Sequence, residues 1–322
     1  MKEPDASQRP AFLFANRSRM EKGIIRPPRG MEVIVNDHCN ISCRQCNHAS
    51  PVMPKYNADP GTLQRDLTLL ARVYGPHYAK IIGGEPLLHP DLAAFMEAVR
   101  ASGLTDRLIL VTNGTLRRRM TPGIWRGLTE VELSVYPGVG LDAAEIARWE
   151  ADAKANHRKI RVCHFPEFRF TFTSQPNPDP ALVRDVFDAC KMAHVWGCHA
   201  YYGGRIHRCP QSIYAPAIAG APMEDGFALD GGEDLASRLL AYLNSESPLK
   251  SCTHCVGSCG KRIDHALIPR EGWRADCDRP VEDILDRALM ERSLRERIDP
   301  DDCKIIERRK RGLLGRIAAS LR

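Results

Sequence analysis

The stretch MEVIVNDHCNISCRQC, residues 31–46, joins an apolar run to three cysteines. The apolar run has the continuous pattern of a buried β-strand. The cysteines follow as Cys39-x3-Cys43-x2-Cys46, all within one short segment. Three thiols placed directly after a strand indicate an iron–sulfur cluster, a zinc site or a disulfide, and other parts of the sequence distinguish these interpretations.

Strand and helix patterns alternate from residue 31 to residue 165. This order predicts a parallel sheet with helices outside, and functional groups then gather at the C-terminal strand ends. Cys39, the GGEP motif at 83–86, the TNG motif at 112–114 and Ser134 each follow or end a predicted strand. The predicted strands are 31–37, 78–84, 107–114, 130–137 and 159–165, and the predicted helices are 60–74, 89–103, 121–128 and 141–157.

The composition favours metal or cluster ligation. The chain has 322 residues, 43% of them hydrophobic and 27% charged, which is ordinary for a globular protein. It has neither a secretion signal nor an apolar run of the roughly 20 residues that span a membrane, so we expect a cytoplasmic protein. Twelve cysteines in reducing cytosol argue against disulfides. Zinc is the weaker interpretation for the first group, because no fourth ligand lies nearby.

The C-x3-C-x2-C segment after a first strand, followed by GGEP and TNG, resembles the radical S-adenosylmethionine (radical SAM) superfamily. The resemblance covers about residues 31–165 and implies an α/β fold, a partial (β/α)6 TIM-like barrel. It implies a [4Fe–4S] cluster on Cys39, Cys43 and Cys46, with one iron left open for S-adenosylmethionine (SAM). Reductive cleavage of SAM would give a 5′-deoxyadenosyl radical that abstracts hydrogen from a substrate. The implied SAM-pocket residues are Gly83, Gly84, Glu85, Thr112, Asn113 and Ser134.

A second group of cysteines lies in a region with few long periodic segments, which favours a bound metal or cluster as a structural support. Cys190, a predicted hairpin that delivers Cys209, and the pair Cys252 and Cys255 resemble the twitch domain, the smaller relative of the SPASM domain. The resemblance implies an auxiliary [4Fe–4S] cluster on these four thiols, with Cys198 as the alternative to Cys190. Zinc stays the alternative occupant, because four thiolates suit it equally well.

The resemblance also implies an enzyme. Only 38 residues precede Cys39, too few for a cobalamin-binding or peptide-recognition domain, so a small substrate is favoured. We expect oxidation or epimerisation of a carbinol carbon in a carbohydrate-like metabolite. Cys259 is then the candidate hydrogen-atom donor of an epimerase. The alternatives are a peptide maturase and, outside enzymes, a zinc-stabilised binding protein.

The expected organisation has four parts: a basic N-terminal extension (1–30), the radical SAM barrel (31–185), a small Cys-rich auxiliary-cluster domain (186–280) and a basic helical tail (281–322). The net charge of +6 is concentrated at the two ends, and solvated termini are the simpler interpretation. A membrane contact through the amphipathic segment 305–321 is the lesser alternative. We expect no nucleic-acid partner. The expected partners are a small anionic or sugar-like substrate and an external one-electron reductant of flavodoxin or ferredoxin type.

Overall fold

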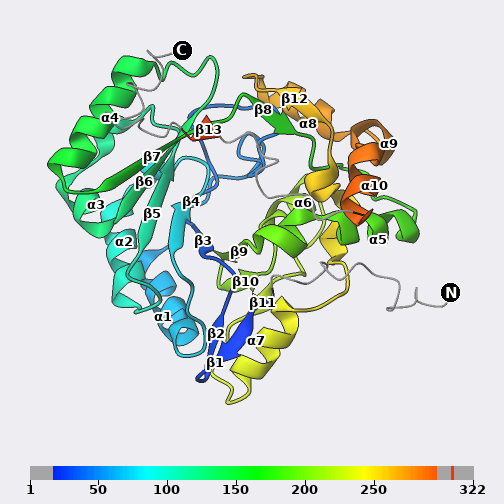
Figure 1. Ribbon diagram of the computed structural model, residues 1–322, viewed down its shortest axis with the longest axis horizontal. Helices are drawn as coiled ribbons and strands as arrows, with labels where there is room; N and C mark the ends of the chain where they lie inside the picture. Colours follow the sequence, from blue (N-terminus) through cyan, green and yellow to red (C-terminus); the bar gives the residue numbers. More distant parts are fainter. Residues whose placement is uncertain (1–16, 296–305, 308–322) are drawn as a thin grey trace, which may run out of the picture.

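The computed structural model describes residues 17–295 and 306–307 (Figure 1). Most of the expected basic tail, and residues 1–16, lie outside the described residues. The largest sheet has nine strands, in the order β11-β10-β9-β3-β4-β5-β6-β7-β13. Six of them form its parallel part: β3 (Met31–Ile34), β4 (Ala79–Ile82), β5 (Leu108–Thr112), β6 (Glu130–Val135), β7 (Lys159–His164) and β9 (His199–Tyr202). The predicted α/β class with a largely parallel sheet is therefore confirmed.

Four helices connect the strands from β3 to β7 and lie along the outer side of the sheet (Figure 1). Three of them are capped by the side chain of the residue that precedes the helix. An oxygen of that side chain accepts a hydrogen bond from a backbone N–H of the first turn, which would otherwise lack a partner. Thr121 accepts from the N–H of Ile124 at 3.3 Å, and Asp59 and Asp142 cap their helices in the same way. The helices are α1 (Pro60–Ala71), α2 (Leu92–Ala101), α3 (Pro122–Gly127) and α4 (Ala143–Ala155).

The outer face of the parallel sheet packs against these helices in the main hydrophobic core. Leu63, Leu67 and Leu70 of α1 are buried, in agreement with their predicted helical spacing. Trp125 of α3 and Trp149 of α4 lie edge to face, with ring centroids 6.3 Å apart. This packing fixes the strand ends that carry the predicted motifs.

The sixth parallel strand, β9, was not predicted from the sequence. β9 pairs with β3, with Met31 opposite His199, so it adds to the edge beside the first strand and not beside β7. A hairpin then leads to β10 (Arg205–His207), which pairs with β11 (Phe227–Ala228). Its turn residues Gly203 and Gly204 have φ of 53° and 79°, the left-handed pair of a type I′ turn. The predicted hairpin before Cys209 is thus present, and the sheet continues across the expected domain boundary.

The other elements lie mostly across the sheet from α1–α4 (Figure 1). In this part β8 (Glu167–Arg169) and β12 (Arg262–Asp264) form a two-stranded antiparallel sheet. The helices here are α5 (Pro180–Ala189), α6 (Gln211–Ala219), α7 (Leu235–Leu243), α8 (Arg270–Cys277), α9 (Val281–Ile284) and α10 (Arg287–Arg295). Short elements are β1 (Arg19–Glu21), β2 (Ile24–Arg26), β13 (Ile306–Glu307), the π-helix η4 (Met192–Trp196) and the 3-10 helices η2 (Pro86–Leu88), η3 (Arg117–Arg119), η5 (Lys250–His254) and η6 (Gly257–Cys259). Within the described residues, no helix has both the length and the apolar character that crossing a membrane requires.

Candidate functional site

The three thiols of the first cysteine group line one cavity of about 340 Å³. Cys39, Cys43 and Cys46 line it from the segment that follows β3. Residues at the ends of β4, β5 and β6 line it as well. These are the predicted pocket residues Gly83, Gly84, Thr112, Asn113 and Ser134, so the fold brings together all the predicted SAM-pocket residues except Glu85.

Glu85 is fully buried and joins two strand ends instead of lining the cavity. Its carboxylate accepts hydrogen bonds from Thr112 Oγ1 at 2.7 Å and from the backbone N–H of Asn113 at 2.8 Å. It also accepts from the N–H of Leu87 at 3.1 Å. Burial raises the pKa of Glu85 to about 7, because the low dielectric disfavours the charged form. Glu85 therefore holds the GGEP segment against the TNG segment.

The two glycines of GGEP are required by a close backbone contact. A Cβ on Gly83 would lie 2.2 Å from the carbonyl oxygen of Asn36, and one on Gly84 would lie 2.1 Å from that of His38. The N–H of Gly84 donates to the Asn36 carbonyl at 2.9 Å. The glycines thus let the end of β4 pack directly on the chain that leads into Cys39.

An amide network connects the TNG motif to the first cysteine. Asn113 Nδ2 lies 3.6 Å from Cys39 Sγ and donates to Asn40 Oδ1 at 3.0 Å. Asn40 Nδ2 donates in turn to Thr115 Oγ1 at 2.8 Å. Sequence reasoning did not identify Asn40 or Thr115, although both are polar residues directly beside predicted motifs. Together these side chains fix the position of Cys39.

The C-terminal part of the described chain holds the middle of the cysteine segment. Trp273 Nε1 of α8 donates to the Cys43 carbonyl at 3.1 Å. The N–H of Arg44 donates to the Ala266 carbonyl at 2.8 Å, and its guanidinium pairs with Asp276. None of these contacts was predicted, because they join residues more than 200 positions apart.

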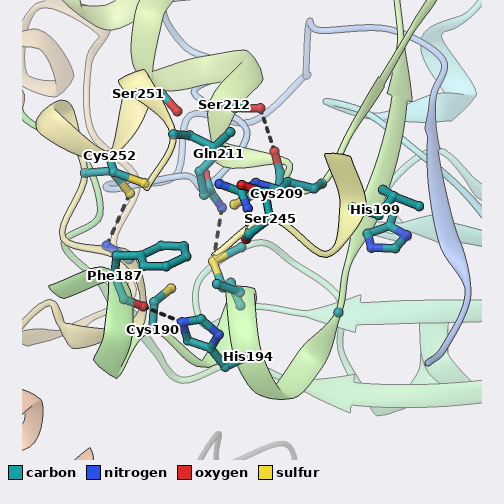
Figure 2. A pocket seen from close by; sticks show the side chains of 18 of the residues that line it. Phe187, Cys190, His194, His199, Cys209, Gln211, Ser212, Ser245, Ser251 and Cys252 are labelled. Carbon is teal, nitrogen blue, oxygen red and sulfur yellow. Dashed lines mark hydrogen bonds between the residues drawn. The ribbon is translucent and has the colours of Figure 1, made fainter. Parts of the chain in front are cut away.

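Four of the later cysteines line a second cavity of about 70 Å³ (Figure 2). Cys190 follows α5, Cys209 follows β10, and Cys252 and Cys255 lie in and just after η5. They are the predicted auxiliary set. The predicted alternative Cys198 does not line this cavity.

Gly257 lies where the two cavities meet and lines both of them. Its φ is +56°, and a Cβ there would lie 2.7 Å from Cys190 Sγ. Its N–H points to Cys255 Sγ at 3.2 Å. A glycine is therefore needed at this position both for the left-handed backbone and for the proximity of the Cys190 sulfur.

Burial controls the protonation of these thiols. It raises the pKa of both Cys39 and Cys252 to about 12, and it also raises the pKa of Cys209 well above its usual range. Each thiol therefore stays protonated near pH 7 unless a metal supplies positive charge, and a coordinated thiol is deprotonated. Two basic side chains, Arg17 and Arg208, also line the second cavity.

The predicted hydrogen-atom donor lies elsewhere. Cys259 is fully buried in an apolar cluster with Phe170, Val256 and Ile284. It lines neither of the two cavities formed by the described residues. The neighbouring Ser258 reaches the first cavity instead. The geometry gives the prediction for Cys259 no support.

Single metal ions fit neither thiol group well. Among the residues that the structure describes, no three His, Cys, Asp or Glu side chains are grouped closely enough to hold one metal ion. A tetrahedral zinc ion with Zn–S bonds of about 2.3 Å requires its sulfurs to lie about 3.8 Å apart. A multi-iron cluster accepts thiolates that are farther apart, and the thiol-only donor set suits it.

Relatives with a known activity match about one third of the chain, while no protein-family model matches. The GTP 3′,8-cyclase of Xanthomonas axonopodis pv. citri is 32% identical over 118 residues, which are 34% of this chain and 35% of that protein. The GTP 3′,8-cyclase of Helicobacter pylori is 32% identical over 108 residues, 33% of this chain and 34% of that protein. The match thus spans about a third of the length of these relatives.

Two solved structures overlap with part of the chain. BtrN in complex with AdoMet and 2-DOIA covers 60% of this chain and 75% of its own, with 19% identity and a TM-score of 0.39. Streptococcus suis SuiB bound to S-adenosylmethionine covers 43% of this chain and 34% of its own, with 18% identity and a TM-score of 0.35. These overlaps are too partial to indicate a substrate. GTP 3′,8-cyclases are radical SAM enzymes, and the match to them confirms the resemblance to that superfamily which the sequence predicted.

Proposed function

We propose that this chain is a radical SAM enzyme in which Cys39, Cys43 and Cys46 hold a SAM-binding [4Fe–4S] cluster. The observation that carries the proposal is the shared cavity: the three thiols and the ends of β4, β5 and β6 line one cavity of about 340 Å³. When bound, the cluster and SAM supply a 5′-deoxyadenosyl radical that abstracts hydrogen from a substrate. An external one-electron reductant, a small flavodoxin or ferredoxin in the cytoplasm, is part of this proposal.

The residues of this chain position and shield the reacting groups. Asn113 holds the Cys39 thiol, and Gly83 and Gly84 let the end of β4 pack on the chain that leads into Cys39. Tyr136 packs against Phe165, with ring centroids 5.8 Å apart. Both rings line the cavity, and apolar walls of this kind exclude water from reactive intermediates.

We further propose that Cys190, Cys209, Cys252 and Cys255 hold an auxiliary [4Fe–4S] cluster in a twitch-like domain. The support is that all four thiols line one small cavity. Zinc is the competing occupant, and metal analysis distinguishes the two. Gly257 and Met192 line both cavities, so the two proposed cluster sites are neighbours in the fold.

The proposed substrate is a small carbohydrate-like metabolite that is oxidised or epimerised at a carbinol carbon. The cavity of about 340 Å³ lies in the range of small-molecule sites, about 300–1,000 Å³, and it would hold the cluster and SAM as well as the substrate. Its lining combines aromatic rings with Glu167, Arg169 and Arg262, and such a mixture suits a hydroxylated ring. If the enzyme instead carried out this reaction on a peptide, a carbohydrate-like substrate would be excluded.

Anaerobic reconstitution tests the cofactors. We expect about eight irons and eight sulfides per chain, four of each in every cluster, and 5′-deoxyadenosine after reduction with dithionite. The Cys43→Ala variant should lose about half of the iron and all SAM cleavage. Cys163→Ala, which changes a buried thiol that lines neither cavity, is the control and should keep both. Bound zinc without iron would refute the enzyme proposal.

Product analysis tests the reaction. A product two mass units lighter than the substrate indicates oxidation. Deuterium incorporated from D2O into a product of unchanged oxidation state indicates epimerisation. SAM cleavage that is stimulated only by peptides would overturn the small-molecule proposal.

A further inference from the structure

We propose that His48 donates a hydrogen bond from its Nε2–H group to a sulfur of the first cluster, and that Tyr214 fixes the ring for this role. The inference rests on the proposed function, because it takes Cys39, Cys43 and Cys46 as the cluster ligands. His48 lies two residues after Cys46, and its ring lines the same cavity as the three thiols. Hydrogen bonds to cluster sulfurs help to set the reduction potential, so a donor at this position would tune it.

The buried phenol of Tyr214 determines which ring nitrogen of His48 carries the proton. Tyr214 lies in α6 and is fully buried in the hydrophobic cluster that also contains Ile34 and Trp273. Its hydroxyl lies 3.0 Å from His48 Nδ1, and no other described residue is hydrogen-bonded to it. A buried O–H without an acceptor is unfavourable, so the hydroxyl donates and Nδ1 accepts. A neutral imidazole has one donor and one acceptor nitrogen, and the proton therefore lies on Nε2.

The Nε2–H group is left for a ligand of the cavity. Within the part of the chain that the structure describes, Nε2 has no hydrogen-bond partner, and it is not one of the fully enclosed polar atoms either. The two ring nitrogens point in different directions, and the bond made by one sets the role of the other. Tyr214 does not line the cavity, whereas His48 does. The donor of the ring is therefore available to a group bound beside the three thiols.

The chain around His48 is already arranged around the Cys46 sulfur. Backbone N–H groups of His48, Ala49 and Ser50 are hydrogen-bonded to this thiol. The N–H of Ala49 also donates to the Cys46 carbonyl at 2.8 Å. N–H groups gathered in this way stabilise a negative sulfur. The backbone turn and the bond to Tyr214 together hold the imidazole beside Cys46.

A cluster sulfur is the acceptor that this place in the fold favours, because the ring follows a cluster ligand by two residues. Reduction adds an electron to the cluster, and a hydrogen bond to a more negative acceptor is stronger. The bond from Nε2–H therefore stabilises the reduced state and raises the reduction potential. The carboxylate of SAM and the substrate are competing acceptors, and the experiment separates them from the cluster.

A redox titration followed by electron paramagnetic resonance tests the inference on the reconstituted full chain without SAM. The signal of the first cluster is identified by its response to SAM that is added afterwards, since this cluster has the open iron. His48→Leu should lower its midpoint potential by about 59 mV, which for one electron is a tenfold change in the equilibrium constant. A hydrogen bond to a charged acceptor contributes about that factor. His48→Gln keeps an N–H donor and should retain most of the potential.

Tyr214→Phe tests the positioning role with little change in packing. It should lower the potential by a smaller amount than His48→Leu, because both tautomers of the His48 ring become available. Tyr74→Phe is the matched control, since Tyr74 is also buried and its hydroxyl lies 2.9 Å from Nδ1 of His199. His199 lines the second cavity and not the first, so this control should leave the potential of the first cluster unchanged.

Failure of the inference and failure of the proposed function give different results. An unshifted potential in His48→Leu and Tyr214→Phe, with a SAM-responsive cluster present, would overturn the inference alone. A shift that occurs only with SAM bound would also overturn it, because the ring would then bind SAM. If His48→Leu assembles no cluster, the result for Tyr214→Phe decides. A parent protein without any SAM-responsive iron–sulfur signal would overturn the proposed function.

Discussion

Replacing Gly257 by alanine should disrupt the second thiol site while leaving the first one largely intact. The backbone at Gly257 has a φ of +56°, and an added Cβ would lie 2.7 Å from Cys190 Sγ. A left-handed conformation costs a non-glycine residue about 1–2 kcal/mol, and overpacking a buried contact costs about 1–3 kcal/mol. The two terms together amount to about 2–5 kcal/mol. A free-energy change of 1.36 kcal/mol corresponds to a tenfold change in an equilibrium constant. The folded state with correctly placed thiols is therefore disfavoured by a factor of about 30 or more.

Iron content and denaturant unfolding of the anaerobically reconstituted protein measure this effect. We expect iron to fall from about eight to about four per chain, and 5′-deoxyadenosine formation without substrate to persist. Gly272→Ala is the matched control, because no atom lies within 4 Å of its added Cβ and alanine favours the helix by about 0.5–1 kcal/mol. Full iron content in Gly257→Ala, with an unfolding free energy within about 0.5 kcal/mol of the parent, would refute the reasoning.

Three further predictions concern the second site and its surroundings. Cys190→Ser should lose the auxiliary iron whereas Cys198→Ser should retain it, as measured by iron analysis; the reverse result would assign the ligand to Cys198. Arg208→Gln should move the reduction potential of the auxiliary cluster to more negative values, because the change removes a positive charge that lines its cavity. Arg205→Gln, which changes an exposed residue of β10, is the control and should leave the potential unchanged. Burial lowers the pKa of the His199 side chain from 6.5 to about 4. The part of the unfolding free energy that depends on a neutral His199 is therefore fully present above pH 6.5 and is lost as the pH falls toward 4. His199→Gln should make the unfolding free energy of the apoprotein less dependent on pH in that window, and an unchanged dependence would contradict this.

Local patterns predicted the alternating part of the fold well. The helices around Leu63 and Trp149, and the strands between them, follow from hydrophobic spacing and from capping residues such as Thr121. The thiols of Cys39, Cys43 and Cys46 could be placed in one site because their spacing is short. These features depend on residues that are close in sequence, so a local sequence pattern can reveal them.

Features that depend on distant residues could not be predicted. The pairing of β9 with β3 has no local signal, because a strand pattern does not name its neighbour. Glu85 was expected to face the ligand, but its buried carboxylate binds donors of Thr112 and Asn113. Trp273 reaches the Cys43 carbonyl across 230 positions. Tertiary packing determined each of these outcomes.

The segments between the two thiol sites are joined by hydrogen bonds. Asn47, next to the last cysteine of the first group, accepts from Thr171 Oγ1 at 3.0 Å. The carbonyl of Thr171 accepts at 2.9 Å from the N–H of Val256, the neighbour of Cys255. Two hydrogen bonds therefore connect the chain beside Cys255 to the first cysteine segment. Because α8 also contacts Cys43, the Cys-rich part completes the first site as well as forming the second, and the barrel strands alone do not position the first three thiols.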